Sequence, residues 1–191
     1  MKKHPTSHPN IILAGFMGTG KSVVGKLLAK RLSRPFLDMD ELIEYREART
    51  INQIFETDGE PYFRQLEAAL CQELSERSGY VIATGGGTLI PEANFKIMAE
   101  TGWVICLDCE PDTLWRRIGA SKNRPMLVEQ DETRFEHLMT LLAQRQSAYQ
   151  RIPYHIDVTH QNIVKVVNRI INNLPLEMSL TMSEYEYLGL I

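Results

Sequence analysis

The feature that most constrains this chain is the stretch GFMGTGKS at residues 15–22, directly after the apolar run IILA at residues 11–14. Two glycines, a lysine and a hydroxyl residue occupy the fixed positions of G-x-x-x-x-G-K-[ST]: Gly15, Gly20, Lys21 and Ser22. Apolar residues with helical spacing follow over 23–32. A strand, a glycine turn and a helix in this order direct backbone N–H groups and a helix dipole into one concavity. The pattern predicts a phosphate-binding loop rather than a glycine turn that binds nothing.

The residue types of this loop each suit a separate contact with a nucleotide. Lys21 is long enough to reach the β- and γ-phosphates of ATP. The Ser22 hydroxyl is a suitable ligand for the Mg²⁺ that bridges these phosphates. The sequence therefore predicts ATP and Mg²⁺ at this loop.

Composition limits the remaining possibilities. A chain of 191 residues with 43% hydrophobic content is long enough for one domain with a buried core. The net charge of −3 argues against nucleic acid or an anionic membrane surface as the main partner, and no apolar stretch approaches the ~20 residues that span a bilayer. The polar start MKKHPTSHPN lacks the apolar segment of a secretion signal, so we expect a cytoplasmic protein.

Two of the three cysteines, Cys106 and Cys109, form the C-x-x-C pattern of many redox and metal sites. They lie in WVICLDC (103–109), a predicted strand, where side chains three residues apart face opposite sides. The spacing favours buried structural cysteines over a redox or metal pair.

Predicted strands and helices alternate along the chain. The strands are predicted at 10–16, 35–40, 80–87, 103–109 and 154–158. This alternation is typical of an α/β fold with a mostly parallel, doubly wound sheet, in which ligands bind outside the carboxyl ends of the strands. Within residues 51–77 we expect two helices, with a break around Asp58, Gly59 and Pro61.

Charged residues follow the second predicted strand. In LDMD, Asp38 and Asp40 are two residues apart, so both carboxylates of an extended chain point the same way, towards magnesium and a substrate hydroxyl. The alternative for Asp40 is a helix cap. Arg64 is followed three residues later by Glu67, which predicts an intrahelical ion pair. A guanidinium oriented in this way is also a bidentate clamp for a substrate carboxylate.

Further candidate site residues are three consecutive glycines and several basic residues. Three glycines, 85–87, end the third strand and expose backbone N–H groups to an anion or hydroxyl. A later basic cluster suits either a solvated surface or a lid over a nucleotide. Its members are Arg116, Arg117, Lys122 and Arg124. Arg145, on the predicted helix 131–151, faces either solvent or the site, and the spacing leaves both open.

Six motifs in order resemble the shikimate kinase family over residues 10–174. They are GFMGTGKS, LDMDELIE, IFETDGEPYFRQLE, ATGGG, RRIGASKNRPML and QRQSAYQ. The resemblance implies the three-layer α/β fold of P-loop kinases related to nucleoside monophosphate kinases, with five parallel strands in order 2-3-1-4-5 and helices on both faces. It also implies transfer of the γ-phosphate of ATP to the 3-hydroxyl of shikimate, a step towards chorismate and the aromatic amino acids.

The resemblance implies roles for individual residues. The implied catalytic residues are Lys21, Asp40 as the base, and Arg124 from the lid. The implied ATP contacts are Gly18, Thr19, Gly20, Lys21, Ser22, Val23, Arg124 and, stacked on adenine, Arg117. Mg²⁺ would be held by Ser22 and, through water, by Asp38. The implied shikimate contacts are Asp40 at the hydroxyls, Arg64 and Arg145 at the carboxylate, the backbone of Gly85, Gly86 and Gly87, and Phe55 and Phe63 as walls.

The resemblance also divides the chain. We expect a flexible segment at 1–9, one kinase domain at 10–174 and an extension at 175–191. Within the domain, the substrate-binding region is about 39–70 and the lid about 119–130. The lid reads RPML where family members more often have RPLL, a volume-conserving change. We expect the extension to dock on its own body or on a neighbouring chain. The expected partner is a small molecule, with no nucleic acid or membrane, and the expected state is a monomer unless the extension mediates self-association.

Other functions share parts of this pattern. A gluconate-type kinase also acts on a polyhydroxy acid, but the contexts of Arg64 and Arg145 favour shikimate. A nucleoside monophosphate kinase is expected to have a G-x-P-R-type stretch where this chain has TGGG. A nucleotide-binding regulatory module without catalysis is disfavoured by the intact Lys21, Asp40 and Arg124.

Overall fold

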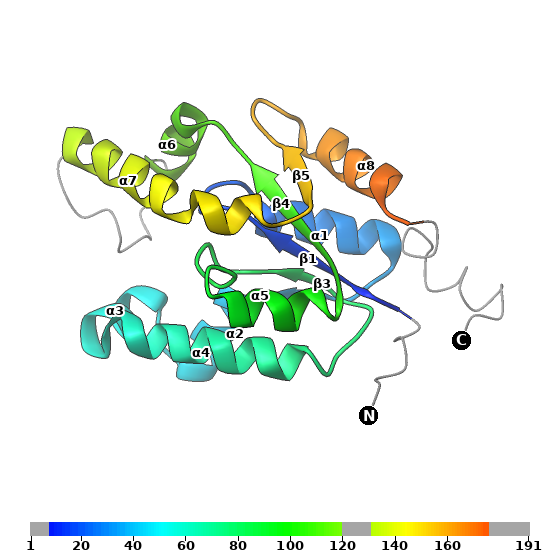
Figure 1. The fold of residues 1–191 in the computed structure, drawn as a ribbon, viewed down its shortest axis with the longest axis horizontal. Helices are drawn as coiled ribbons and strands as arrows, with labels where there is room; N and C mark the ends of the chain where they lie inside the picture. The colour runs from blue at the N-terminus through cyan, green and yellow to red at the C-terminus, as the bar shows by residue number, and fades with distance from the viewer. Residues whose placement is uncertain (1–7, 120–130, 176–191) are drawn as a thin grey trace.

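The computed structural model describes residues 8–119 and 131–175 (Figure 1). Within these ranges, the chain forms five strands and eight helices, with one to three helices after each strand. The strands are β1 (Asn10–Ala14), β2 (Phe36–Asp38), β3 (Val81–Ala83), β4 (Gly102–Asp108) and β5 (Tyr154–Asp157). The helices are α1 (Lys21–Leu32), α2 (Met39–Glu47), α3 (Ile51–Thr57), α4 (Gly59–Leu74), α5 (Glu92–Ala99), α6 (Pro111–Gly119), α7 (Asp131–Gln150) and α8 (Ile163–Asn173).

Three predicted segments fall largely outside the described residues. The lid at about 119–130, with Arg124, is described only at Gly119, and the extension 175–191 only at its first residue. Of the segment 1–9, His8 and Pro9 are described. His8 is 5% exposed, and its carbonyl accepts a hydrogen bond from the backbone N–H of Gly79 at 2.6 Å.

The five strands form one parallel sheet in the order β2-β3-β1-β4-β5, which confirms the predicted fold class and strand order. The central strand β1 is buried on both faces, as its continuous apolar sequence indicates. Because all strands run the same way, their carboxyl ends meet at one side of the sheet, which we call the carboxyl edge. The loops that follow β1, β2 and β3 therefore lie close together.

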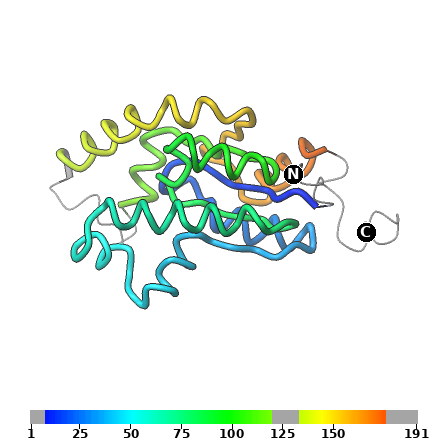
Figure 2. The backbone as a smooth tube through the Cα atoms, turned by 60° about the horizontal axis from the view of Figure 1, so that its bottom comes forward, coloured from blue at the N-terminus to red at the C-terminus, as the bar shows by residue number. Residues whose placement is uncertain are grey.

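Helices cover both faces of the sheet and bury two apolar clusters (Figure 1). On one face, α1 and α8 pack on alternate residues of the strands, among them Ile11 and Ile105. On the other face, α2 to α5 pack on the intervening residues, among them Ile12 and Val104. A third cluster joins α6 and α7 to Phe16 of the loop after β1. In both views, α3 and the start of α7 project at the same end of the molecule (Figure 2).

The element boundaries refine the sequence prediction in two places. The helix pair α3 and α4 breaks at Asp58, as predicted, and Gly59 has a positive φ of 79° that favours glycine there. The second strand ends at Asp38 rather than at residue 40, because the Asp38 side chain caps α2. None of the described helices has the length and apolar content to cross a membrane.

Candidate active site

The loop between β1 and α1 is a glycine turn that rests on β4. Gly15, Gly18 and Gly20 all have positive φ values, of 130°, 83° and 90°. A Cβ at residue 15 would lie 2.5 Å from the carbonyl oxygen of Leu107. Glycine at position 15 therefore allows the backbone of the loop to approach β4 closely.

Two side chains of the loop are tied to its own backbone. The Nζ of Lys21, a residue only 9% exposed, donates to the carbonyls of Gly15 at 2.9 Å and Phe16 at 3.0 Å. The Thr19 hydroxyl donates to the same Phe16 carbonyl at 2.9 Å. These bonds hold the ammonium group at the turn. The Thr19 side chain is buried in the loop, although the sequence analysis placed this residue among the ATP contacts.

Ser22 and Asp38 meet where the first two strands end. The Ser22 hydroxyl donates to Asp38 Oδ2 at 2.5 Å. The other carboxylate oxygen of Asp38 accepts the backbone N–H groups of Asp40 at 3.0 Å and Glu41 at 3.4 Å. The helix cap is thus Asp38, and Asp40 lies in the first turn of α2 and lines the cavity. The cap alternative considered for Asp40 is therefore wrong.

The three glycines after β3 leave space that charged side chains of the site occupy. A Cβ on Gly85 would lie 2.7 Å from Asp40 Oδ1 and 2.8 Å from Glu67 Oε1. A Cβ on Gly87 would lie 2.4 Å from Arg64 Nη1. The absence of side chains therefore has a second purpose beyond exposing N–H groups: it lets charged groups from α2 and α4 gather against this loop.

Arg64 is oriented by two carboxylates of its own helix. Its guanidinium donates to Glu67 Oε2 at 2.6 Å and to Glu60 Oε1 at 2.7 Å, so the predicted ion pair is present. Glu67 is 1% exposed, and its second oxygen accepts a hydrogen bond from Thr88. Burial by itself lowers the pKa of Arg64, but the two carboxylates outweigh it and the pKa is raised. The guanidinium therefore stays charged.

Arg145 comes from α7 on the other side of the glycine loop and is 6% exposed. Its guanidinium carbon lies 5.5 Å from the centroid of the Phe16 ring, in cation–π geometry. One turn later, the Tyr149 hydroxyl donates to the Gly86 carbonyl at 2.6 Å. Burial raises the pKa of Tyr149 to about 12. Of the two orientations that the sequence left open, Arg145 has the one that faces the site.

Two further predictions concern aromatic and basic neighbours. The rings of Phe55 and Phe63 pack at a centroid distance of 5.0 Å. Arg117 donates to the carbonyl of Val158 at 3.1 Å and lies 3.5 Å from that of Gly18, so it joins α6 to the loop after β1.

One cavity of about 520 Å³ brings most of these residues together. Thr19 is absent from its lining, and Arg124 lies outside the described residues. The predicted site residues that line it are Gly18, Gly20, Lys21, Ser22, Val23, Asp38, Asp40, Phe55, Phe63, Arg64, Gly85, Gly86, Gly87, Arg117 and Arg145.

The sequence analysis missed part of the lining. The missed residues are Met17, Glu41, Glu44, Ile51, Asn52 and Thr84, and Glu67 was considered only as a partner of Arg64. Asn52 lies in the first turn of α3, which begins at Ile51 after the N-cap Thr50 and has a capping box of Thr50 and Gln53. That box predicts the helix start, but nothing in it indicates that the first turn faces a cavity.

Comparison with known proteins agrees with this geometry. A family model described as "Shikimate kinase" matches residues 17–175. The chain belongs to the shikimate kinase family. A shikimate kinase of Geobacter sulfurreducens is 40% identical over 166 residues, which cover 87% of this chain and 91% of the relative. One of Pelotomaculum thermopropionicum is 39% identical over 165 residues, 86% of this chain and 95% of the relative.

Solved structures give the same assignment. The shikimate kinase of Acinetobacter baumannii, solved in complex with shikimate, superposes with a TM-score of 0.82 at 35% identity, covering 88% of this chain and 96% of that one. A gluconokinase of Sinorhizobium meliloti is 16% identical and superposes with a TM-score of 0.54 over 95% of this chain and 97% of that one. This similarity shows only the fold. As a member of the shikimate kinase family, the chain is an ATP-dependent phosphotransferase. The gluconate-type alternative is not favoured.

Proposed function

We propose that this chain transfers the γ-phosphoryl group of ATP to the 3-hydroxyl of shikimate, giving shikimate 3-phosphate and ADP. The observation that carries the proposal is one cavity lined both by Lys21 and Ser22 of the phosphate-binding loop and by Arg64 and Arg145. The loop suits a polyphosphate, and a pair of guanidinium groups suits a small carboxylate.

On the nucleotide side, the backbone of residues 18–20 and the Lys21 ammonium bind the phosphates. The bonds from Lys21 to two loop carbonyls keep its positive charge at the turn. Arg117, which already contacts the loop, stacks on the adenine.

Mg²⁺ fits the residues at the junction of β1 and β2. This ion takes oxygen ligands, and the Ser22 hydroxyl and the Asp38 carboxylate bring two oxygens within 2.5 Å of each other at the cavity. Ser22 would hold the ion directly and Asp38 through water. When bound, Mg²⁺ neutralises charge on the β- and γ-phosphates.

On the acceptor side, Arg64 and Arg145 bind the shikimate carboxylate, and Phe55 and Phe63 line the ring. Asp40 accepts the proton of the 3-hydroxyl as the oxygen bonds to the γ-phosphorus. The bond from that phosphorus to the bridging oxygen breaks, and ADP leaves with the electron pair. Arg124, assigned from the sequence resemblance, stabilises charge on the transferred group.

We further propose a single kinase domain over residues 10–174 that acts as a monomer in the cytoplasm. The three cysteines are free, which fits a reducing compartment.

Release of ADP, measured with shikimate, gluconate and nucleoside monophosphates in parallel, tests the proposal. We expect release with shikimate, together with shikimate 3-phosphate detected by mass spectrometry. Faster release with gluconate would assign the chain to another acceptor. Binding of ATP without release in the presence of any acceptor would support the regulatory alternative.

A further inference from the structure

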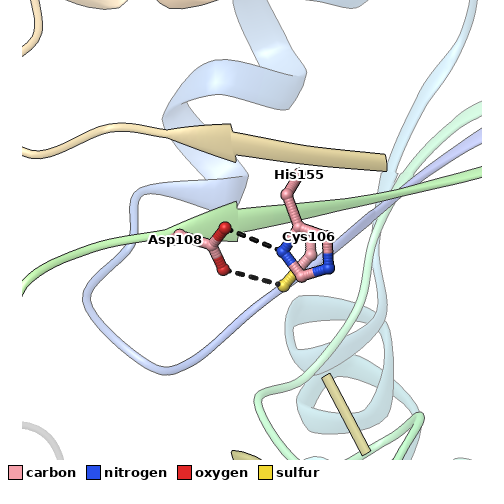
Figure 3. A group of neighbouring side chains, drawn as sticks. All are labelled: Cys106, Asp108 and His155. Atoms are coloured by element: carbon pink, nitrogen blue, oxygen red, sulfur yellow. Dashed lines mark hydrogen bonds and ion pairs between the residues drawn. The ribbon is translucent and has the colours of Figure 1, made fainter. Parts of the chain in front are cut away.

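A cluster of three potential metal ligands lies between the carboxyl end of β4 and the first residues of β5, outside the kinase cavity (Figure 3). Cys106 and Asp108 are two apart on β4, so their side chains share one face of the sheet. His155 of the edge strand β5 pairs directly with Cys106 in the parallel ladder. The strand register thus places a thiol, a carboxylate and an imidazole together.

Both ring nitrogens of His155 lie beside oxygen atoms. His155 Nε2 lies 2.9 Å from the Ile152 carbonyl oxygen, which only accepts hydrogen bonds, so Nε2 carries a proton. His155 Nδ1 lies 2.7 Å from Asp108 Oδ2. In a neutral ring with its proton on Nε2, both of these atoms have lone pairs. The lone pairs of His155 Nδ1 and Asp108 Oδ2 are therefore directed at one position that a metal ion can take.

The donor set and its surroundings favour a metal ion of intermediate softness. The three ligand atoms, Cys106 Sγ, a carboxylate oxygen of Asp108 and a ring nitrogen of His155, all lie within 4.8 Å of one another. Sulfur, nitrogen and oxygen ligands together are typical of Zn²⁺ and unsuited to Mg²⁺. The Ile152 carbonyl fixes the imidazole through its other nitrogen, as outer partners of ligating histidines do.

Burial gives the cluster one closed and one open side. Cys106 is 1% exposed, whereas the side chains of Asp108 and His155 are 46% and 34% exposed. An ion from solvent can therefore reach the carboxylate and imidazole first and then the thiol. Burial, with Asp108 nearby, raises the pKa of Cys106, so the thiol keeps its proton when no ion is bound. The open side leaves a fourth position for water.

The neighbouring cysteine does not belong to this cluster. Cys109 Sγ lies 3.6 Å from Arg117 Nη1, and its ligand atom is not part of the group. The C-x-x-C pattern in the sequence therefore does not define the donor set. The partner of Cys106 is the residue opposite it on β5.

We propose that Cys106, Asp108 and His155 form a three-ligand Zn²⁺ site, completed by water, between the carboxyl end of β4 and the first residues of β5. The ion binds His155 Nδ1, Asp108 Oδ2 and Cys106 as the thiolate, and the proton of the thiol goes to solvent. It links β4 and β5 beside Leu107, whose carbonyl faces Gly15 of the phosphate-binding loop. The site is independent of the proposed kinase reaction.

Titration of the full chain with Zn²⁺ against a chromophoric chelator tests the site. Excess Mg²⁺ is present throughout, so that oxygen-only positions such as Ser22 and Asp38 do not contribute. We expect one equivalent of Zn²⁺ to bind. Cys106→Ala, His155→Gln and the isosteric Asp108→Asn should each weaken binding by at least about tenfold. Cys109→Ala is the matched control and should bind as the natural chain does.

Two further readouts identify the ligands and check folding. Co²⁺ should give a thiolate charge-transfer band that disappears in Cys106→Ala. Zn²⁺ should raise the melting temperature of the natural chain and of Cys109→Ala, but not that of the three ligand variants. Circular dichroism confirms that each variant is folded. Absence of Zn²⁺ binding above background would overturn the proposal, as would binding that the ligand variants leave unchanged or that Cys109→Ala removes.

Discussion

Gly87 lies directly beneath the guanidinium of Arg64, so that a Cβ at position 87 would come within 2.4 Å of Nη1. The glycine loop after β3 and the arginine of α4 therefore have to be considered as one unit. The three consecutive glycines are explained by what packs against them as much as by the conformation of the turn.

Gly87→Ala should displace Arg64 and raise the KM for shikimate, while the KM for ATP changes little. The methyl group overlaps a charged group that is held between two carboxylates. Steady-state kinetics with each substrate varied in turn measures the two KM values separately. The matched control is the same substitution in an Arg64→Ala background, where the added methyl group should have almost no further effect. An equal cost in both backgrounds would contradict this explanation.

Arg64→Ala should raise the KM for shikimate by about 10- to 150-fold, the equivalent of about 1.5 to 3 kcal/mol for a charge-assisted bond. The KM for ATP should stay nearly constant. Because Glu67 is 1% exposed, removing its partner also leaves a buried carboxylate with less compensation, and the melting temperature should fall. Equal weakening of both substrates would remove Arg64 from the carboxylate site.

Asp38→Asn should raise the Mg²⁺ concentration needed for half-maximal activity by about tenfold or more, as substitutions of outer-sphere partners of a metal do. The free energy of unfolding should change little, because Asn caps a helix nearly as well as Asp. A suitable control is Asn162→Ala, which removes the cap of α8. It should cost about 1 kcal/mol of stability without altering the Mg²⁺ requirement.

Because of Tyr149, the free energy of unfolding should depend on pH in the alkaline range. Its pKa is about 12 in the folded chain against 10.0 unfolded. Between these values the unfolded chain loses a proton that the folded chain keeps. Stability is therefore unaffected by this group below pH 10 and falls by about 1.4 kcal/mol per pH unit above it. Denaturant unfolding at several pH values gives the free energy of unfolding. In Tyr149→Phe this free energy should fall less steeply with pH above 10, by about 1.4 kcal/mol per pH unit. An unchanged slope would mean that the tyrosine titrates normally.

Arg124 lies outside the described residues, and its role is inferred from the motif RPML. Arg124→Ala should lower kcat by about 10² to 10⁴, by analogy with arginine fingers, with smaller changes in either KM. Arg117→Ala, by contrast, should mainly raise the KM for ATP. Thermal melting of both variants checks the fold. A near-normal kcat in Arg124→Ala would contradict a catalytic role and favour the alternative, a solvated basic residue.

Much of the fold was predictable because its signals are local. The phosphate-binding loop was found from spacing within eight residues, and its helix from the periodicity that follows. The alternation of strands and helices predicted a parallel sheet. The end of the second strand, predicted at residue 40 and found at Asp38, is also a local matter: Asp38 and Asp40 are both suitable caps, and which of them caps α2 depends on where the backbone leaves the extended conformation.

What the sequence alone determined is thus the type of chemistry, through residues that lie within one loop or one helix turn: Lys21 and Ser22 of the loop after β1, and Arg64 with Glu67. The tertiary structure decided which distant residues share a space. It oriented Arg145 towards the site, placed Gly87 under Arg64 and paired Cys106 with His155. The physical reason is that strand register and helix packing arise from burial of the whole apolar core, so no short segment contains that information.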